Sequence, residues 1–236
     1  MSLIGFAKRT GKILLSISTA IIILINLLSA VKSNNINAYY FKRNQYNKIA
    51  LTFDDGPHPV YTGKILDVLE KYDVKATFFI IGENAKYYKD TLMKIVNKGH
   101  ELGNHTFSHA IIKGKSAVDI MEEIEGCRNA IYDICGENTV LFRPPGGIMA
   151  DVTAEDGEMF ENYDIILWSI DTMDWACHEP QKIAEYVINN TKSGDIILMH
   201  DYIGKDSPTP EALEIIIPSL IARGYEFVTV GELISY

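Results

Sequence analysis

The sequence predicts a parallel α/β fold, and the prediction depends on one pattern. Short apolar runs alternate along residues 48–236 with segments whose apolar residues recur at helical spacing. Parallel strands joined by helices are the usual outcome of such a pattern, and their crossover connections are right-handed. A closed barrel and an open sheet both fit the pattern, and either one would bind ligands at the carboxyl ends of the strands.

Seven runs are predicted to be strands because they are short, apolar and rich in β-branched or aromatic residues. No internal repeat and no low-complexity tract interrupts their order. The predicted strands are Ile49–Phe53, Thr77–Ile81, His100–Leu102, Val140–Phe142, Ile165–Ile170, Ile196–Met199 and Phe227–Val230.

Three helices are predicted between these strands from apolar residues that share one helical face. Ser116 is expected to cap the second helix, and Thr209 with Pro210 to open the third, which Gly224 closes. The apolar faces are Ile65, Leu66, Leu69 and Tyr72; Ile120, Ile124, Cys127, Ile131 and Ile134; and Leu213, Ile216, Ile217, Leu220 and Ile221.

Residues 1–31 are predicted to form a signal peptide or an N-terminal membrane anchor. The stretch from Ile13 to Val31 carries no charge and follows Lys8, Arg9 and Lys12. Its length nearly reaches the roughly 20 residues of a membrane-spanning helix, and the positive-inside rule then places the rest of the chain outside the cytoplasm. Retention is slightly favoured over cleavage because no clean small-x-small site follows, and a buried core helix is the weaker alternative.

The remaining chain divides into a linker and one catalytic domain. Residues 32–47 are rich in Asn and Tyr and show no apolar period, which is typical of a linker. Residues 48–236 then form the domain, and with sixteen basic against 31 acidic residues it carries a net charge of −15. Such a surface disfavours nucleic acid and polyanions, and it suits a neutral polysaccharide or one that becomes cationic as amines are released.

The three cysteines predict no disulfide framework. Cys127 and Cys135 are eight residues apart on one predicted helix, about 12 Å at 1.5 Å per residue, which is too far for a disulfide. We interpret them, and Cys177, as small apolar side chains. No obligate protein partner is implied.

Polar residues suited to metal binding and acid–base chemistry come directly after five of the predicted strands. Because the carboxyl ends of parallel strands meet at one rim of the fold, we expect these residues to converge on one site. They are Asp54, Asp55, His105, His109, Arg143, Asp171, Asp174, His200 and Asp201.

Two of these histidines predict a metal site. His105 and His109 are four residues apart, close enough to bind one ion if the segment is helical or tightly turned. One carboxylate of the Asp54-Asp55 pair would complete a set of two imidazoles and one carboxylate, which is typical of catalytic rather than structural sites. Zinc fits this set best, and cobalt, iron and manganese are the alternatives.

The other carboxylate of the pair is a candidate general base. Two adjacent carboxylates in a dry cleft need a cation or an arginine beside them, and Arg143 is a candidate to hold the base in its charged form. The alternative interpretation of the pair is an Asx-type turn leading into Gly56-Pro57. His200, at the end of an apolar strand, is a candidate general acid.

Five segments, in order, resemble the motifs of the polysaccharide deacetylases, the NodB-homology carbohydrate esterases of family 4. The resemblance covers about residues 49–233, and five ordered motifs are far more specific than any one of them. The segments are Thr52-Phe53-Asp54-Asp55-Gly56-Pro57, His105-x-x-x-His109, Arg143-Pro144-Pro145-Gly146-Gly147, Asp171-x-x-Asp174-Trp175 and Leu198-Met199-His200-Asp201.

The resemblance implies a distorted (β/α) barrel of about seven strands and a role for each motif residue. Gly146 departs from the family, which often has an aromatic residue there; it keeps the backbone N–H that helps to hold the oxyanion but loses a wall of the substrate groove. The resemblance also implies that Asp55, His105 and His109 bind the metal and that Asp54 is the catalytic base, which Arg143 steadies. It implies that His200 protonates the leaving amine and that Asp171 orients or tunes His200. Trp175 and Leu198 are implied to line the acetyl pocket.

These inferences predict an exported, metal-dependent hydrolase that removes N-acetyl groups from N-acetylglucosamine polymers. Peptidoglycan is favoured over chitin-type oligomers because the enzyme is predicted to be tethered outside the membrane. A second enzyme hypothesis is an O-acetyl esterase on xylan-type glycans. A hypothesis of another class is a membrane-anchored wall-binding protein without catalysis, and the base, the acid and the arginine argue against it, since binding alone needs none of them.

Overall fold

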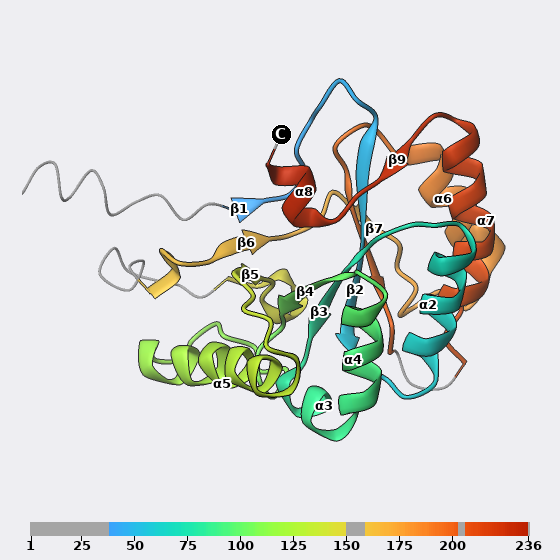
Figure 1. Ribbon diagram of the computed structural model, residues 1–236. Coiled ribbons are helices and arrows are strands. Elements are labelled where there is room, and N and C mark those ends of the chain that lie inside the picture. Colours follow the sequence, from blue (N-terminus) through green and yellow to red (C-terminus); the bar gives the residue numbers. More distant parts are fainter. Residues whose placement is uncertain (1–37, 150–158, 203–205, 236) are drawn as a thin grey trace, which may run out of the picture. The chain divides into compact units, whose positions relative to one another are not determined.

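The computed structural model contains a parallel sheet at the centre of an α/β fold, as predicted (Figure 1). The structure describes residues 38–149, 159–202 and 206–235. The helices and strands named here belong to the compact unit formed by residues 37–151 and 162–236. Along its main path the strand order is β1-β6-β5-β4-β3-β2-β8-β7, with β9 paired to β2, and each of these strand pairs is parallel.

Nine strands and seven α-helices make up the described unit. The strands are β1 (Ala38–Tyr39), β2 (Lys48–Gly56), β3 (Thr77–Ile80), β4 (Glu101–Asn104), β5 (Leu141–Phe142), β6 (Asp164–Ile166), β7 (Ile170–Asp171), β8 (Ile196–His200) and β9 (Glu226–Phe227). The helices are α2 (Tyr61–Lys71), α3 (Gly82–Tyr87), α4 (Lys89–Asn97), α5 (Ala117–Cys135), α6 (Pro180–Asn190), α7 (Thr209–Ala222) and α8 (Val230–Ile234), with a 3-10 turn, η1 (Pro145–Gly147).

The sheet curls but does not close into a complete barrel. Its path begins at β1 and ends at β7, and these two strands do not pair with each other in the described chain. The fold is therefore a curled half-barrel of parallel strands. The predicted parallel strand direction and helical connections are confirmed. The described sheet is an open half-barrel of nine strands, where a distorted barrel of about seven was expected.

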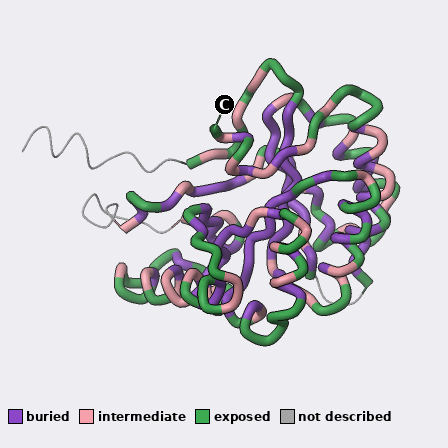
Figure 2. Tube along the Cα trace, viewed as in Figure 1, coloured by how far each residue is buried: buried purple, intermediate pink, exposed green. Residues whose placement is uncertain are grey.

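The central strand β2 separates the apolar core from the site. Ile49, Leu51 and Phe53 point to one side, where they pack in the main apolar cluster with residues of α2, α7 and the neighbouring strands. Because side chains alternate along a strand, Thr52 and Asp54 point to the other side. Figure 2 shows that the buried residues follow the strands, while the exposed ones lie on the outer faces of the helices.

The helix boundaries follow ordinary capping rules. The Ser116 hydroxyl accepts a hydrogen bond from the backbone N–H of Asp119 at 3.2 Å and caps α5, as predicted. The same helix ends at Gly136, whose φ of 75° suits a residue without a side chain. Helices α2, α6 and α7 pack beside one another, and α3, α4 and α5 form a second group (Figure 1).

The predicted strand Ile165–Ile170 is two strands, β6 and β7. The carbonyl groups of Ile166 and Leu167 accept hydrogen bonds from the Arg143 guanidinium at 3.0 and 3.2 Å. Backbone that is hydrogen-bonded to a side chain in this way is not available to a strand ladder, so the strand is interrupted.

Two further predictions differ from the structure at the edges of the fold. The predicted strand Phe227–Val230 ends early, because the Thr229 hydroxyl accepts from the backbone N–H of Glu232 at 3.3 Å and starts α8. Part of the predicted linker is folded: β1 pairs with β6, and the backbone N–H of Lys42 donates to the carbonyl of Gly194.

Within the described ranges, none of the helices has the length and apolar character to cross a membrane. The predicted membrane segment, Ile13–Val31, lies outside the described residues.

Candidate active site

A cavity of about 400 Å³ lies at the carboxyl ends of the strands, where the sequence predicted a site. It contains nine of the ten residues to which the sequence assigned a role, and the tenth, Arg143, is fully buried and bonded to one of them. The residues that line the cavity are Asp54, Asp55, His105, His109, Gly146, Trp168, Asp171, Trp175, Leu198 and His200.

A β-bulge lets two consecutive carboxylates face this cavity. Neighbouring residues of a regular strand point to opposite sides, so Asp54 and Asp55 would be separated by the sheet. In the pairing of β2 with β3, Asp54 lies opposite Phe79 and Gly56 lies opposite Ile80, which leaves Asp55 as an extra residue. Its φ of 77° turns it out of the regular strand. Both carboxylates therefore line the same cavity.

Polar groups on neighbouring elements hold the bulge in place. The side-chain amide of Asn84 donates to the backbone carbonyl of Asp55 at 2.8 Å. A side chain at Gly56 is excluded, because a Cβ there would lie 2.1 Å from a carboxylate oxygen of Asp201. The backbone N–H of Asp201 also donates to the carbonyl of Asp54 at 3.1 Å.

Asp55, His105 and His109 come together as a set of three potential metal ligands. The Nε2 atoms of His105 and His109 lie 3.5 and 3.2 Å from Oδ1 of Asp55. One ligand atom from each residue can be chosen so that all three lie within 4.8 Å of one another. The predicted grouping of these residues is therefore present in the structure.

The chemistry of this set fits a divalent cation. Nδ1 of His105 lies 2.7 Å from the Arg143 carbonyl, to which it donates, so that the lone pair of Nε2 is left on the Asp55 side. Oδ1 of Asp55 is buried and has no hydrogen-bond partner among the described residues. Burial raises the pKa of Asp55, but both imidazoles lower it by more, so the net shift is downward. Two imidazoles and an anionic oxygen facing one point are what a cation such as zinc or cobalt requires.

Arg143 holds Asp54 on the other side of the bulge. Its Nη1 atom lies 2.7 Å from Oδ1 of Asp54 and 2.9 Å from the hydroxyl of Thr52. The guanidinium also lies 4.0 Å from the centre of the Phe79 ring. Every part of this pair is buried, so Asp54 has a fixed position with one oxygen bound to Arg143 and the other 3.8 Å from Nε2 of His105.

Asp174, and not Asp171, orients His200, which corrects the role implied for Asp171. Oδ1 of Asp174 lies 2.7 Å from Nδ1 of His200, and its Oδ2 accepts from the His200 backbone N–H at 2.8 Å. The hydroxyl of Thr209 donates to the same Oδ2 at 2.8 Å. Asp171 lines the cavity, and its carboxylate accepts from the backbone N–H of Met173 at 2.8 Å.

The environment of His200 favours its protonated form. Burial lowers the pKa of His200, but the hydrogen bond and the charge of Asp174 raise it by more, with smaller contributions from Asp54 and Asp55, and the result is a pKa of about 9. An imidazolium at neutral pH can donate a proton to a leaving group.

The two residues to which the resemblance assigns the acetyl pocket, Trp175 and Leu198, lie in the cavity wall, together with one aromatic residue that the sequence did not single out. Leu198 is buried, and Trp175 is 53% exposed at the rim. The additional residue is Trp168, which follows β6. A Cβ at Gly147 would lie 2.6 Å from the Trp168 ring, so η1 needs glycine where it meets this wall.

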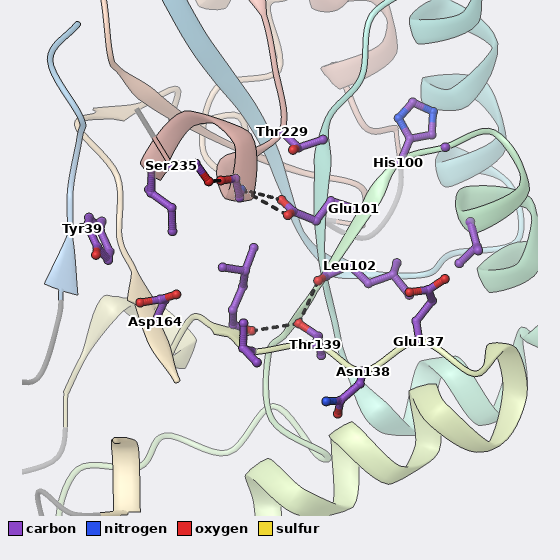
Figure 3. A pocket seen from close by; sticks show the side chains of 16 residues that line it. Tyr39, His100, Glu101, Leu102, Glu137, Asn138, Thr139, Asp164, Thr229 and Ser235 are labelled. Atoms are coloured by element: carbon purple, nitrogen blue, oxygen red, sulfur yellow. Dashed lines mark hydrogen bonds between the residues drawn. The ribbon is translucent and has the colours of Figure 1, made fainter. Parts of the chain in front are cut away.

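A larger hollow, about 730 Å³, lies elsewhere in the fold (Figure 3). It is lined by residues near the amino ends of β4, β5 and β6 and by α8. One of its carboxylates, Glu101, accepts hydrogen bonds from the backbone N–H of Gly231 and the hydroxyl of Thr77. These bonds give Glu101 a structural role, and no set of metal ligands lines this hollow in the described chain.

The fold and the smaller cavity together define an α/β protein with a hydrolase-type site, and comparison with known proteins gives its family. Residues 42–161 match the family model described as polysaccharide deacetylase. A peptidoglycan-N-acetylglucosamine deacetylase of Bacillus cereus is 39% identical over 80% of this chain and 88% of that protein. The chain belongs to the polysaccharide deacetylase family.

Two other relatives carry different names within this family. The peptidoglycan-N-acetylmuramic acid deacetylase PdaC of Bacillus subtilis is 37% identical over 78% of this chain, and the match spans 38% of that protein. The solved structure of a family 4 acetyl xylan esterase from Clostridium thermocellum, in complex with a cobalt ion, is 39% identical with a TM-score of 0.73. That match covers 80% of this chain and 90% of the esterase chain.

Proposed function

We propose that this protein is a metal-dependent deacetylase that removes N-acetyl groups from N-acetylglucosamine residues of peptidoglycan. The observation that carries the proposal is one cavity that contains the Asp55, His105 and His109 set, the Arg143-bound Asp54 and the Asp174-bound His200. A cation site, a carboxylate and a protonated imidazole are the groups that amide hydrolysis requires.

Asp55, His105 and His109 would hold the cation, with zinc as the favoured ion. When bound, it would polarise the acetyl carbonyl and lower the pKa of water in the site, from 15.7 to about 7 in the most effective zinc sites. Asp54 accepts a proton from the attacking water. Its second oxygen is available for this because Arg143 binds the first.

The protein also acts on the oxyanion and on the leaving group. The backbone N–H of Gly146, in the cavity wall, donates to the tetrahedral oxyanion, a contact whose loss typically costs about 10²-fold or more in rate. His200 donates its proton to the amine nitrogen as the C–N bond breaks. An amine leaves less readily than an alcohol, so an amide substrate depends on His200 more than an ester does.

Peptidoglycan is the favoured substrate for two reasons. The relatives at 39% and 37% identity are named for peptidoglycan sugars, and the acidic domain suits a glycan that gains amino groups. An extracytoplasmic location, through residues 1–31 as a signal peptide or membrane anchor, would place the enzyme beside this polymer. The second candidate is an O-acetyl xylan-type esterase, which the 39% identity to an acetyl xylan esterase supports.

The proposal is tested by measuring acetate release. Purified protein is treated with a chelator, reloaded with zinc or cobalt, and incubated with peptidoglycan, chitin oligomers and acetylated xylan. We expect acetate from the N-acetylated polymers, none before reloading, and none from the Asp54→Asn variant. No acetate from any N-acetylated polymer at saturating metal would refute the proposal.

A second variant distinguishes the two enzymatic candidates. His200→Ala should reduce amide turnover far more than ester turnover, because only the amine needs a proton in order to leave. A metal-loaded protein that binds glycan but releases no acetate would instead support the non-catalytic wall-binding alternative.

A further inference from the structure

Four aromatic side chains gather near the carboxyl ends of β2 and β8. His58 and Tyr202 lie in the segments after these strands, Tyr61 begins α2, and Tyr88 lies between α3 and α4. The His58 ring stacks on Tyr202, with ring centres 4.6 Å apart and planes 8° apart. Tyr61 stacks on the same imidazole at 5.3 Å, and Tyr88 lies 6.3 Å from it in a tilted arrangement. These four residues are called here the aromatic platform.

The aromatic platform lies directly beyond the catalytic residues. Strands β2 and β8 are hydrogen-bonded neighbours, with Asp54 opposite His200. His58 comes three residues after Asp55. Tyr202 comes two residues after His200, so the Cα atoms of these two residues are at most about 7 Å apart. The stacked pair therefore joins the two loops that leave the active site side by side.

Hydrogen bonds beneath the platform fix its geometry. The Thr62 hydroxyl donates to Oδ2 of the buried Asp201 at 2.5 Å and accepts from the His58 backbone N–H at 2.7 Å. Nδ1 of His58 accepts from the backbone N–H groups of Val60 and Tyr61 at 3.2 and 3.1 Å. The imidazole is thus held in the tautomer that carries its proton on Nε2. A fixed aromatic surface loses little conformational entropy when a ligand binds.

The platform is open to solvent although it is apolar. Tyr202 is 41% exposed and Tyr88 is 36% exposed, and next to them Val60 and Tyr87 are 52% and 79% exposed. None of these side chains is part of the two apolar cores. Clustered exposed aromatic residues beside an active site are typical of ligand-binding surfaces.

We propose that the aromatic platform is a sugar-binding subsite for the glycan residue next to the one that is deacetylated, and this proposal rests on the function proposed above. A pyranose ring has an apolar face of C–H groups and a rim of hydroxyls. The rings of Tyr202 and Tyr88 offer flat faces to the C–H groups of the sugar. The phenol groups and Nε2–H of His58 offer hydrogen bonds to the sugar hydroxyls. The platform would select for polymer length, and a single sugar would not reach it.

The test compares substrates of two lengths. Michaelis parameters are measured on the N-acetylglucosamine monosaccharide and hexasaccharide for the metal-loaded protein and for Tyr202→Ala and Tyr88→Ala. We expect KM for the hexasaccharide to rise by about 3- to 10-fold, the range for a lost aromatic stacking contact. kcat and the monosaccharide KM should stay unchanged, and Tyr202→Phe, which keeps the stacking face, should raise the hexasaccharide KM less than Tyr202→Ala does. The matched controls are Tyr132→Ala and Tyr186→Ala, tyrosines of other surfaces with 58% and 50% exposure.

Several outcomes would overturn the subsite. One is an unchanged hexasaccharide KM in both alanine variants; another is an equal change for both substrate lengths, which would indicate an effect on the catalytic residues. A third is impaired action on whole peptidoglycan with normal action on the hexasaccharide, which would point to recognition of the peptide stems. If the unmutated protein releases no acetate, calorimetry with the hexasaccharide still decides: Tyr202→Ala must weaken binding, or the subsite does not exist.

Discussion

Replacing Asp174 with asparagine should move the alkaline limit of activity to lower pH. Asp174 is the main cause of the raised pKa of His200, which is about 9 instead of 6.5. The charge is lost in the variant while the size of the side chain is kept. If the pKa fell fully to 6.5, the protonated fraction of His200 would drop about 4-fold at pH 7 and about 30-fold at pH 8. Burial, which lowers this pKa, and the charges of Asp54 and Asp55, which raise it, remain in the variant and set its final value.

The assay is kcat for acetate release from a chitin oligomer across pH 6 to pH 9 with saturating metal. The sign follows from the direction of the shift: the imidazolium is the active form, a raised pKa keeps it present to higher pH, and its loss in the variant grows as the pH rises. Asp171→Asn is the matched control, since the Asp171 carboxylate accepts from the backbone N–H of Met173 while the His200 ring is bonded to Asp174. A loss in Asp174→Asn that is equal at every pH, or an alkaline shift in Asp171→Asn alone, would refute this assignment.

Three further predictions concern stability, measured by urea unfolding of the chelator-treated protein. Gly147→Ala should lower the free energy of unfolding by about 2–4 kcal/mol, because the new Cβ would lie 2.6 Å from the Trp168 ring and the φ of residue 147 is 68°. The control is Gly136→Ala, where φ is 75° but no atom lies within 4 Å of the new Cβ, and its free energy of unfolding should fall by only about 1 kcal/mol. Arg143→Met should cost about 3–5 kcal/mol, because it leaves a buried carboxylate unpaired, and a loss below 1 kcal/mol would contradict this. Burial raises the pKa of Asp201 from 3.8 to about 7, so the unfolded chain binds fewer protons than the folded one between these values, and stability falls as the pH rises through this window. In Asp201→Asn that decline should be smaller, and an unchanged slope would show that another group causes it.

The sequence predicted the composition of the site better than its internal pairing. Acidic, basic and imidazole residues placed after apolar runs were enough to predict that they converge, because parallel strands end at a common edge. The partner of His200 was assigned wrongly, because Asp171 and Asp174 both follow the same predicted strand. Only the path of the chain after β7 decides between them, and it places Asp174 against both the imidazole and the His200 backbone N–H.

The bulge at Asp55 was also beyond the sequence pattern. A regular strand would have separated the two adjacent carboxylates, and the pattern contains no direct sign of an extra residue. Gly56 was the available hint, since glycine in a strand often marks a bulge or a close approach of another group. Here it marks both, because the carboxylate of Asp201 occupies the space that a side chain would need.

Strand boundaries were predicted well where burial decides them and poorly where side chains compete for the backbone. β3 and β8 agree with the prediction to within one residue at each end. The predicted strand Ile165–Ile170 was split by hydrogen bonds from Arg143, a residue more than 20 positions away. The end of the last strand was readable, because Thr229 and Glu232 have the spacing of a helix-capping box.

The position of β2 has a consequence for how the protein loses activity. This strand is bonded to β3, β8 and β9, and its residues from Lys48 to Asp54 are buried. Backbone amides in such a strand exchange with solvent only when the whole unit opens. Both carboxylates of the proposed reaction are therefore carried by the slowest-exchanging part of the molecule. Heating or denaturant should abolish cation binding in the same transition that melts the core, without an earlier step in which the site alone is lost.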